Sequence, residues 1–586
     1  MTSDDVALAP PPTIPAPQVP ATRTGRALSW AARNWWATLI VLCLALWLPG
    51  ILSLPPIDRD ESRFAQSSRQ MLETRNFIDI RFGHVPRYKK PAGIYWLQSA
   101  TTALAGLGDR GHIWTYRLAS LLGGTLAVLL CFWCARPFAE AEVAWLGAAL
   151  MGTSLLLTAE STMATTDAVQ LACLMGAMGV LLRIYLAARD PARPPVTTRL
   201  VLIGWAAFAA GILVKGPVVP GVCAVTILAL ILWERGQWRW LGGTRPFLGV
   251  PLMLLIVLPW GIAILLESHG AFYQQSLGQD FAAKLAGGQE SHGAWPGDYL
   301  LLATLSFWPA ILFVLPGLGA AIRKSGDPAT RFLLAWAGAS WLMIEIVPTK
   351  LPNYILPAYP PIAMLAALWM LWPREMGGPR WHAALSYVSV LQFLIGVAAL
   401  AAAPVWASIH YGPGAPWWLV ASAALGAALG IAALVVFLRG SKVAAFAVAI
   451  VAVLLDFPTL TAGAGPRLDA IWISPRAAAL VARNTMPGDP PVSAAGYDEP
   501  SLLFALGTDT RLTDGAGAAE AGAYQGGLAL IEDREQPSFL AHLAERETDA
   551  VPLGGLDGFN YTRGRKVHVT LYRVTATHDV AVPPAE

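Results

Sequence analysis

Acidic and basic side chains stand together in one short stretch, which reads D-R-D-E-S-R over residues 58 to 63. Asp60 and Glu61 fall at the predicted start of a helix, and Arg63 follows one turn along. A carboxylate in this position can cap the free N–H groups of a helix. It can also act as a general base whose charge state is set by a neighbouring arginine. The stretch taken alone leaves both interpretations open.

Two further polar residues interrupt apolar or glycine-rich surroundings. Asp167 stands at the edge of an otherwise apolar run, where an ionisable group is costly and indicates either a functional site or a helix cap. His292 lies in G-G-Q-E-S-H-G-A-W, with no second histidine at ligand spacing. That stretch by itself therefore does not predict a metal site.

Lysine is scarce, with only eight in the chain. Compact ammonium groups at the end of a membrane helix suit the binding of a lipid phosphate. A single lysine there can instead extend its ammonium to the membrane surface. As a group, the lysines favour phosphate binding, because five of the eight fall in loops assigned below to the outer face: Lys89, Lys90, Lys215, Lys284 and Lys350.

The composition excludes a single water-soluble core. Of 586 residues, 55% are hydrophobic and only 13% are charged, and the mean hydropathy is +0.50. Soluble domains usually carry about 25% charged residues. A net charge of only +3 and 24 tryptophans suit a membrane protein and argue against a nucleic-acid partner. The five cysteines all lie in apolar runs, so no disulfide framework is predicted.

Thirteen apolar runs are candidates for membrane spans. Arginines ahead of the first run predict a cytoplasmic N-terminus. A fourteenth segment, Ala92 to Leu107, is predicted to lie at the interface, because only then do the basic loop clusters all fall inside. The runs cover residues 35 to 54, 115 to 136, 141 to 159, 166 to 187, 200 to 214, 217 to 233, 247 to 267, 298 to 322, 329 to 347, 353 to 373, 383 to 409, 415 to 438 and 441 to 464.

The predicted fold class is an all-α polytopic membrane protein of about 13 transmembrane helices with a small C-terminal α/β domain outside the cytoplasm. Residues 1 to 30 are expected to be a disordered cytoplasmic tail, and 31 to 465 the transmembrane domain. The first outer loop, 55 to 114, holds most of the candidate residues and a predicted amphipathic surface helix over 60 to 73. Residues 466 to 586 carry the strand-like runs PVSAAGY, GLALIED and KVHVTLYRV.

Several motifs together resemble one known family. The runs P-P-I-D-R-D-E-S-R-F-A-Q-S-S-R and V-P-R-Y-K-K-P-A-G-I-Y-W-L are similar to the first periplasmic loop of bacterial GT-C glycosyltransferases of the ArnT and protein O-mannosyltransferase-like group. T-T-D at 165 to 167, V-K-G-P at 214 to 217 and T-K-L-P-N-Y-I-L-P from 349 agree with this resemblance. Such enzymes use a polyprenyl-phosphate sugar donor.

The resemblance implies a bacterial inner-membrane enzyme that moves a sugar from undecaprenyl phosphate to lipid A or another envelope acceptor. It assigns catalytic roles to Asp60, Glu61 and Asp167, and a divalent metal to His292. It assigns donor-phosphate binding to Arg63, Tyr88, Lys90, Lys215, Lys350 and Tyr354. Where lipid A aminoarabinose transferases read E-K-P, however, this chain reads Lys89-Lys90-Pro91, so the acidic metal partner is replaced by a base.

Alternatives from other classes remain open at this point. The acceptor could be a protein hydroxyl, as in a protein O-mannosyltransferase. A transporter or flippase would share the many spans, although such proteins commonly show repeated halves and the sequence has no internal repeat. A non-catalytic protein that binds a sugar lipid would retain the cations without the chemistry.

Overall fold

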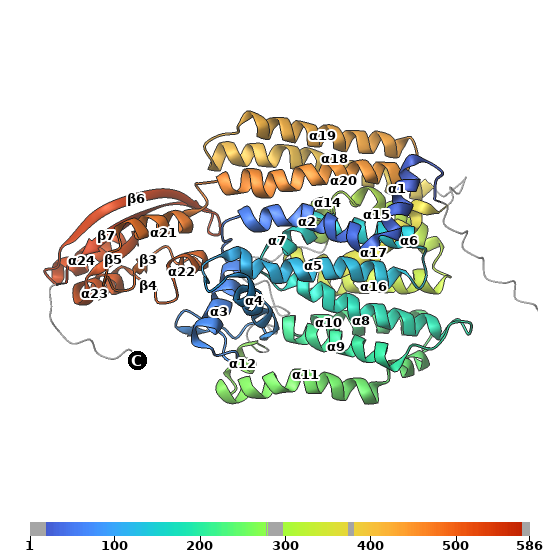
Figure 1. Ribbon diagram of the computed structural model, residues 1–586, viewed down its shortest axis with the longest axis horizontal. Coiled ribbons are helices and arrows are strands. Elements are labelled where there is room, and N and C mark those ends of the chain that lie inside the picture. Colours follow the sequence, from blue (N-terminus) through green and yellow to red (C-terminus); the bar gives the residue numbers. More distant parts are fainter. Residues whose placement is uncertain (1–18, 277, 279–296, 373–379, 577–586) are drawn as a thin grey trace, which may run out of the picture.

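The computed structural model describes residues 19–276, 278, 297–372 and 380–576. A long helical bundle carries a smaller domain of helices and strands at one end (Figure 1). The bundle consists of α1 (Arg23–Arg33), α2 (Trp35–Ser53), α5 (Ile113–Ala135), α6 (Ala141–Gly152), α7 (Leu155–Thr162), α8 (Asp167–Ala187), α9 (Thr198–Lys215), α10 (Val218–Trp233), α11 (Pro246–Glu267), α14 (Asp298–Ser306), α15 (Ile311–Arg323), α16 (Pro328–Ile346), α17 (Tyr359–Leu371), α18 (Arg380–Tyr411), α19 (Trp417–Leu438) and α20 (Lys442–Pro458).

Among the described residues, nine helices are long and apolar enough to cross a membrane. The pair α6 and α7, bent by 64°, makes a tenth span if it is counted as one. All thirteen predicted runs fold as helices. The three that fall short of a full span alone are α10, the interrupted pair α14 and α15, and α16. The predicted polytopic helical fold is confirmed.

Small residues let neighbouring bundle helices approach closely. A Cβ on Gly123 of α5 would lie 2.7 Å from Val169 of α8, and one on Gly317 of α15 would lie 2.8 Å from Ala366 of α17. Within a membrane, where lipid is as apolar as leucine, such close packing is a main source of helix association. The contact at Gly123 fixes the beginning of α8, which carries Asp167.

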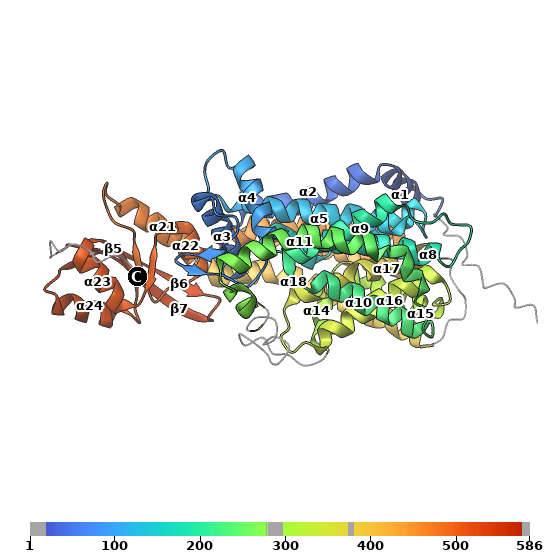
Figure 2. The same cartoon turned by 90° about the horizontal axis from the view of Figure 1, so that it is seen from below.

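The first outer loop folds into α3 (Asp60–Thr74), the hairpin of β1 (Arg81–Phe82) and β2 (Val85–Pro86), and α4 (Gly93–Ala105). At 13 residues, α4 is too short to span a membrane, as its sequence predicted. The helix predicted over residues 60 to 73 is present, but Phe64 and Met71 are buried against protein. Figure 2 shows α3 and α4 between the bundle and the C-terminal domain.

The C-terminal domain is a five-stranded mixed sheet with helices. Strand order is β4-β3-β5-β7-β6, with β3 parallel to β4 and β5, and β7 antiparallel to β5 and β6. The three strand-like runs became β3, β5 and β7. The elements are α21 (Ile473–Asn484), β3 (Ser493–Ala495), α22 (Pro500–Leu506), β4 (Arg511–Thr513), α23 (Gly515–Gln525), β5 (Gly527–Glu532), α24 (Gln536–Glu545), β6 (Ala550–Asn560) and β7 (Arg565–Val574).

Shorter elements connect these parts. They are α12 (Ala271–Tyr273), η1 (Arg239–Thr244), η3 (Pro352–Ala358), η4 (Thr459–Ala464) and η5 (Gly465–Arg467). Of these, η3 bears on the site, because it packs against α7 and α8.

Candidate functional site

Four segments far apart in sequence bring charged side chains together where the bundle meets the first outer loop. Lys215, the last residue of α9, donates from Nζ to Oδ1 of Asp167, the first residue of α8, at 2.5 Å. The hydroxyl of Thr166 donates to the other carboxylate oxygen at 3.0 Å. Both charged side chains are largely buried. Their ion pair therefore fixes the two helix ends relative to each other.

The ring of Tyr354, in η3, lies beside this pair, with its centroid 5.6 Å from the Lys215 ammonium. The sequence predicted roles for both residues, and the structure brings them together. A cation over an aromatic face is attracted by the ring quadrupole. Tyr354 thus helps to hold the ammonium at this end of the bundle.

Glu160, near the end of α7, is a site residue that the sequence reasoning missed. Its side chain is buried, the residue being only 6% exposed, and it accepts a hydrogen bond from the Thr165 hydroxyl at 2.7 Å. It interacts electrostatically with Asp60, Asp167 and Lys215. The ammonium of Lys215 is thus paired with Asp167, and the carboxyl of Glu160 lies within the influence of both charges and of Asp60. An acid within an apolar run, seven residues before Asp167, was the available signal.

Asp60 and Glu61 are neighbours in sequence but have different environments. Glu61 is 2% exposed and forms a buried ion pair with Arg117 of α5, with Oε1 accepting from Nε at 2.7 Å and Oε2 from Nη2 at 2.8 Å. It also accepts the backbone N–H groups of Ile57 and Ala164, each at 2.8 Å.

With four donors, the Glu61 carboxylate is fully satisfied and held away from solvent. This is the environment of an anchor that ties α3 to α5 and to the turn before α8. The catalytic role predicted for Glu61 does not agree with this placement. Asp60, in contrast, is exposed at the first position of α3, and its charge acts on Glu160 and on the phenol of Tyr95. Of the two acids, only Asp60 can reach a substrate.

The cationic side chains of the first loop differ in burial. Arg63 and Lys90 are half-buried, one on α3 and the other in the turn before α4. Arg87, which the sequence reasoning passed over, is buried with its guanidinium 4.6 Å from the ring of Phe64, and it donates to the hydroxyl of Tyr95. Arg87 therefore fastens the turn that carries Lys90 against α3 and α4.

Tyr88 is turned toward the loop itself. Its hydroxyl donates to Oδ1 of Asp79 at 2.8 Å. Burial, followed by the hydrogen bond and charge of Asp79, raises the pKa of Tyr88 to about 12. Because its proton is already donated to a carboxylate, Tyr88 does not offer a donor to a phosphate in this arrangement, in contrast to its predicted role.

Lys350 is nearly buried in the segment between α16 and η3. Its Nζ donates to Oε2 of Glu345 at 2.6 Å and to the Glu345 carbonyl at 3.0 Å, and it lies 4.8 Å from the centroid of the Tyr299 ring. A single carboxylate thus matches its charge. Lys350 differs in this from Lys215, whose partner Asp167 also acts on the buried carboxyl of Glu160.

The metal site implied by the family resemblance finds no support in the residues present. His292 lies outside the described residues. Across the described part of the chain, no three histidine, cysteine or acidic side chains are grouped so as to hold a metal ion. Lys89, an exposed base, occupies the position of the family's acidic ligand. A base at this position does not fit a cation site.

Similarity to known proteins agrees with this geometry. Residues 37–269 match the family model described as dolichyl-phosphate-mannose-protein mannosyltransferase. The chain is 29% identical over 335 residues to an undecaprenyl phosphate-alpha-4-amino-4-deoxy-L-arabinose arabinosyl transferase of Enterobacter sp., with 55% of each chain covered. It is 31% identical over 320 residues to the protein of that name from Aeromonas hydrophila, covering 53% of this chain and 55% of the relative.

Among solved structures, the fold is that of ArnT from Cupriavidus metallidurans bound to undecaprenyl phosphate. The TM-score is 0.69 at 21% identity, and the match covers 92% of this chain and 98% of that one. In sequence, the chain spans about half the length of the curated relatives it matches. The predicted resemblance and the predicted fold are both confirmed.

Proposed function

We propose that this chain, an ArnT-like membrane protein of the GT-C type, transfers a sugar from a polyprenyl-phosphate donor to an envelope acceptor. We further propose that the bacterial inner membrane holds it, with α3, the site and the C-terminal domain on the outer face. The observation that carries the proposal is the buried Lys215–Asp167 pair beside the exposed Asp60 and the buried Glu160.

The arrangement suits a lipid-linked donor, because charge and apolar surface meet there. The bundle offers apolar helices to the polyprenyl chain, and Arg63 and Lys90 of the first outer loop, with Lys215 at the end of α9, would bind its phosphate. A phosphate bound by these groups would develop charge as it leaves, and fixed cations stabilise that charge in the transition state. Lys350 would be a weaker contributor, because Glu345 already neutralises it.

The proposed chemistry is one displacement at the anomeric carbon. Asp60 takes the proton of the acceptor hydroxyl while the oxygen of that hydroxyl forms a bond to the anomeric carbon. The bond between this carbon and the phosphate oxygen breaks. The electron pair leaves with the polyprenyl phosphate. Positive charge gathers on the sugar ring in such transition states. The carboxylates of Glu160 and Asp167 would stabilise it.

For the finer specificity, we propose a 4-amino-4-deoxy pentose as the sugar and lipid A as the acceptor. The relatives' names indicate this sugar for those proteins. The carboxyl groups of Glu160 and Asp60 would also complement a protonated amino group. A protein hydroxyl is the second candidate acceptor, because residues 37–269 match a protein mannosyltransferase family model.

Mass spectrometry of envelope glycolipids and glycoproteins from cells with and without this chain tests the proposal. We expect one sugar to disappear from lipid A and its polyprenyl-phosphate donor to accumulate. Loss from a glycoprotein would select the second acceptor. An unchanged set of glycoconjugates and donor lipids would contradict transferase activity and favour transport or binding.

A further inference from the structure

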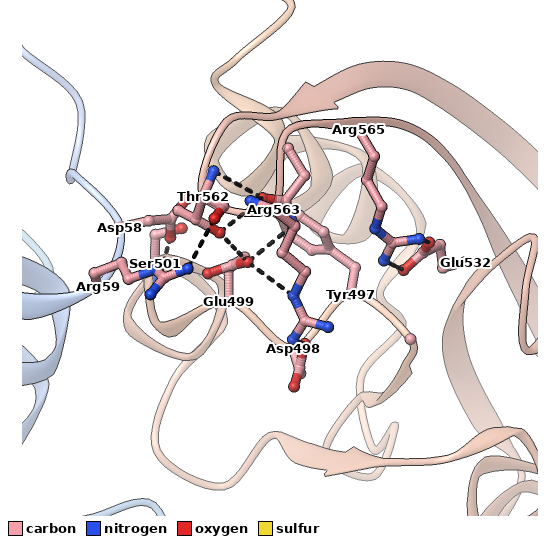
Figure 3. A network of polar contacts seen from close by, with 12 residues as sticks. Asp58, Arg59, Tyr497, Asp498, Glu499, Ser501, Glu532, Thr562, Arg563 and Arg565 are labelled. Atoms are coloured by element: carbon pink, nitrogen blue, oxygen red, sulfur yellow. Dashed lines mark hydrogen bonds and ion pairs between the residues drawn. The ribbon is translucent and has the colours of Figure 1, made fainter. Parts of the chain in front are cut away.

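The C-terminal domain forms hydrogen bonds with Asp58 and Arg59, the two residues that precede Asp60. The backbone N–H of Asp58 donates to the hydroxyl of Tyr561 at 2.7 Å, and Oδ1 of Asp58 accepts the backbone N–H of Ser501 at 3.1 Å. Arg59 donates from Nη2 to the carbonyl of Thr562 at 2.8 Å. Figure 3 shows Asp58 and Arg59 reaching into the domain beside Ser501 and Thr562. The loop is thus held through side chains and backbone alike.

The turn that makes these contacts is itself fixed. Glu499, only 5% exposed, accepts from Nδ2 of Asn560 at 2.9 Å and from the hydroxyl of Thr562 at 2.5 Å. Asn560 in turn accepts the backbone N–H groups of Thr562 and Arg563, each at 3.1 Å. These hydrogen bonds fix the conformation of the turn between β6 and β7, which contacts Asp58 and Arg59.

Arg59 has a backbone conformation that an unrestrained chain rarely adopts. Its φ is +67° and its ψ is −116°, and it directly precedes the first residue of α3. A non-glycine residue held in such a region is strained and persists only where its surroundings enforce it. The contacts of Asp58 and Arg59 supply that restraint. Loss of these contacts would let the backbone of residues 58 and 59 relax and would move Asp60.

A second line of contacts follows α3 away from Asp60. Gln66 donates to the Thr508 hydroxyl at 2.7 Å, that hydroxyl donates to Glu73 at 2.6 Å, and Arg69 donates to the Phe504 carbonyl at 3.1 Å. These bonds hold the rest of α3 against the C-terminal domain. Loss of the contacts made by Asp58 and Arg59 would therefore change only the first turn of the helix. The first turn can therefore be tested separately from the docking of the domain.

We propose that the C-terminal domain is a working part of the transfer site, and that Asp58, Arg59 and Tyr561 are positioning residues for Asp60. This inference rests on the proposed function, since it assumes that Asp60 acts on the acceptor. It gives the domain a role that the sequence left open. A base moved by about 1 Å loses much of its effect, on the order of 10²-fold, although its pocket is otherwise intact.

Turnover by the purified full chain in detergent, with a polyprenyl-phosphate sugar as donor, tests the inference. Tyr561→Phe removes the acceptor of the Asp58 N–H, and Asp58→Ala removes the acceptor of the Ser501 N–H. We expect kcat to fall about tenfold or more in both, with KM for the donor within about twofold. Asp58→Asn keeps an oxygen at the same place and should restore kcat. Glu520→Gln, on an exposed ion pair of the same domain, is the matched control.

Hydrogen exchange of residues 57 to 63 gives a readout independent of turnover. We expect faster exchange there in Tyr561→Phe and Asp58→Ala, and unchanged exchange in the later turns of α3. Wild-type kcat in both variants, together with loss of turnover in Asp60→Asn, would overturn the positioning role alone. Wild-type turnover in Asp60→Asn would instead overturn the proposed function. Slower turnover that Asp58→Asn fails to restore would also overturn the inference.

Discussion

Two clusters of charged side chains lie at opposite ends of the bundle, and they differ in how their charges are paired. At the end away from the C-terminal domain, Glu234 accepts from Tyr185 at 2.6 Å, from Arg331 at 2.8 Å and from Arg189 at 3.1 Å. One carboxylate there meets two guanidinium groups. At the site, the ammonium of Lys215 pairs with Asp167, and the buried Glu160 is repelled by Asp167 and Asp60 and attracted by Lys215.

The comparison separates anchoring from function. A charge with all its partners within the protein has no remaining need for a ligand, and Glu234 and Glu61 are both of this kind. A buried carboxyl beside like charges, as Glu160 is, is costly to ionise and suits a proton or a cationic ligand. The position of a charge in the membrane predicts less about its role than the number of its partners does.

The largest expected effect concerns the anchoring class. Arg117→Ala would leave Glu61 buried without its cation, and removal of one partner of a buried pair typically costs about 3–5 kcal/mol. We expect a sharply lower thermal unfolding temperature or loss of folded protein, measured by fluorescence-detected size exclusion. The double variant Glu61→Leu/Arg117→Leu should recover much of the loss. If Arg117→Ala had normal stability and only slow turnover, Glu61 would belong to the functional class.

Lys215→Ala tests the cluster at the site. It removes the partner of Asp167 and a proposed phosphate contact, and we expect turnover to fall about 100-fold, with Lys215→Arg retaining part of it. Lys350→Ala is the comparison, with a loss of about tenfold, because Glu345 already matches that charge. Equal losses in both variants would remove the distinction between the two lysines.

The positions of apolar helices were predictable from sequence, and those of charge pairs were not. Run length and polarity placed all thirteen helical segments, because a span must satisfy its own backbone in lipid. The Lys215–Asp167 pair joins residues 48 apart, and only tertiary packing brings them together. Helix phase decides that Asp60 is exposed and Glu61 buried, and the sequence pattern gave these adjacent acids equal standing.

Weak local signals account for the elements that were missed. The strand β6 contains Pro552, Gly554, Gly555 and Gly558, which lack strand propensity, so that its pairing with β7 was not visible. The surface face of α3 was predicted to meet the membrane. Its apolar side chains pack against α4 and α22 instead. The prediction failed because hydrophobic periodicity shows that one face of a helix is covered but does not show what covers it.

Stability should depend on pH through Asp58. Burial, opposed by the hydrogen bond from Ser501 and assisted by the charge of Glu499, raises the pKa of Asp58 to about 6 from 3.8. Because the folded form holds this proton more tightly, the charged carboxylate destabilises the fold above pH 6. Asp58→Asn should therefore stabilise the protein by about 3 kcal/mol at pH 8.

The gain from Asp58→Asn should shrink as the pH falls through 6 and disappear below about 4, where the aspartic acid is protonated in both states. Thermal unfolding of both proteins at pH 8, 6 and 4 measures it. A gain of the same size at every pH would show that the ionisation of Asp58 has no part in it.

The smallest effect is expected for Tyr88→Phe. Its hydroxyl serves Asp79 within the first loop, so its removal should change turnover by less than about twofold and cost about 1 kcal/mol in stability. Donor titrations and thermal unfolding measure the two effects. A large rise in KM for the donor would restore the predicted phosphate contact.

The central claim is that Asp60 is the base and that Glu61, beside it, is an anchor. Single-turnover sugar transfer by purified Asp60→Asn, with donor binding measured on the same sample, tests it most directly. We predict a rate lower by about 10³-fold or more, with donor affinity and thermal stability near those of the wild type. Transfer at the wild-type rate by this variant would contradict the account.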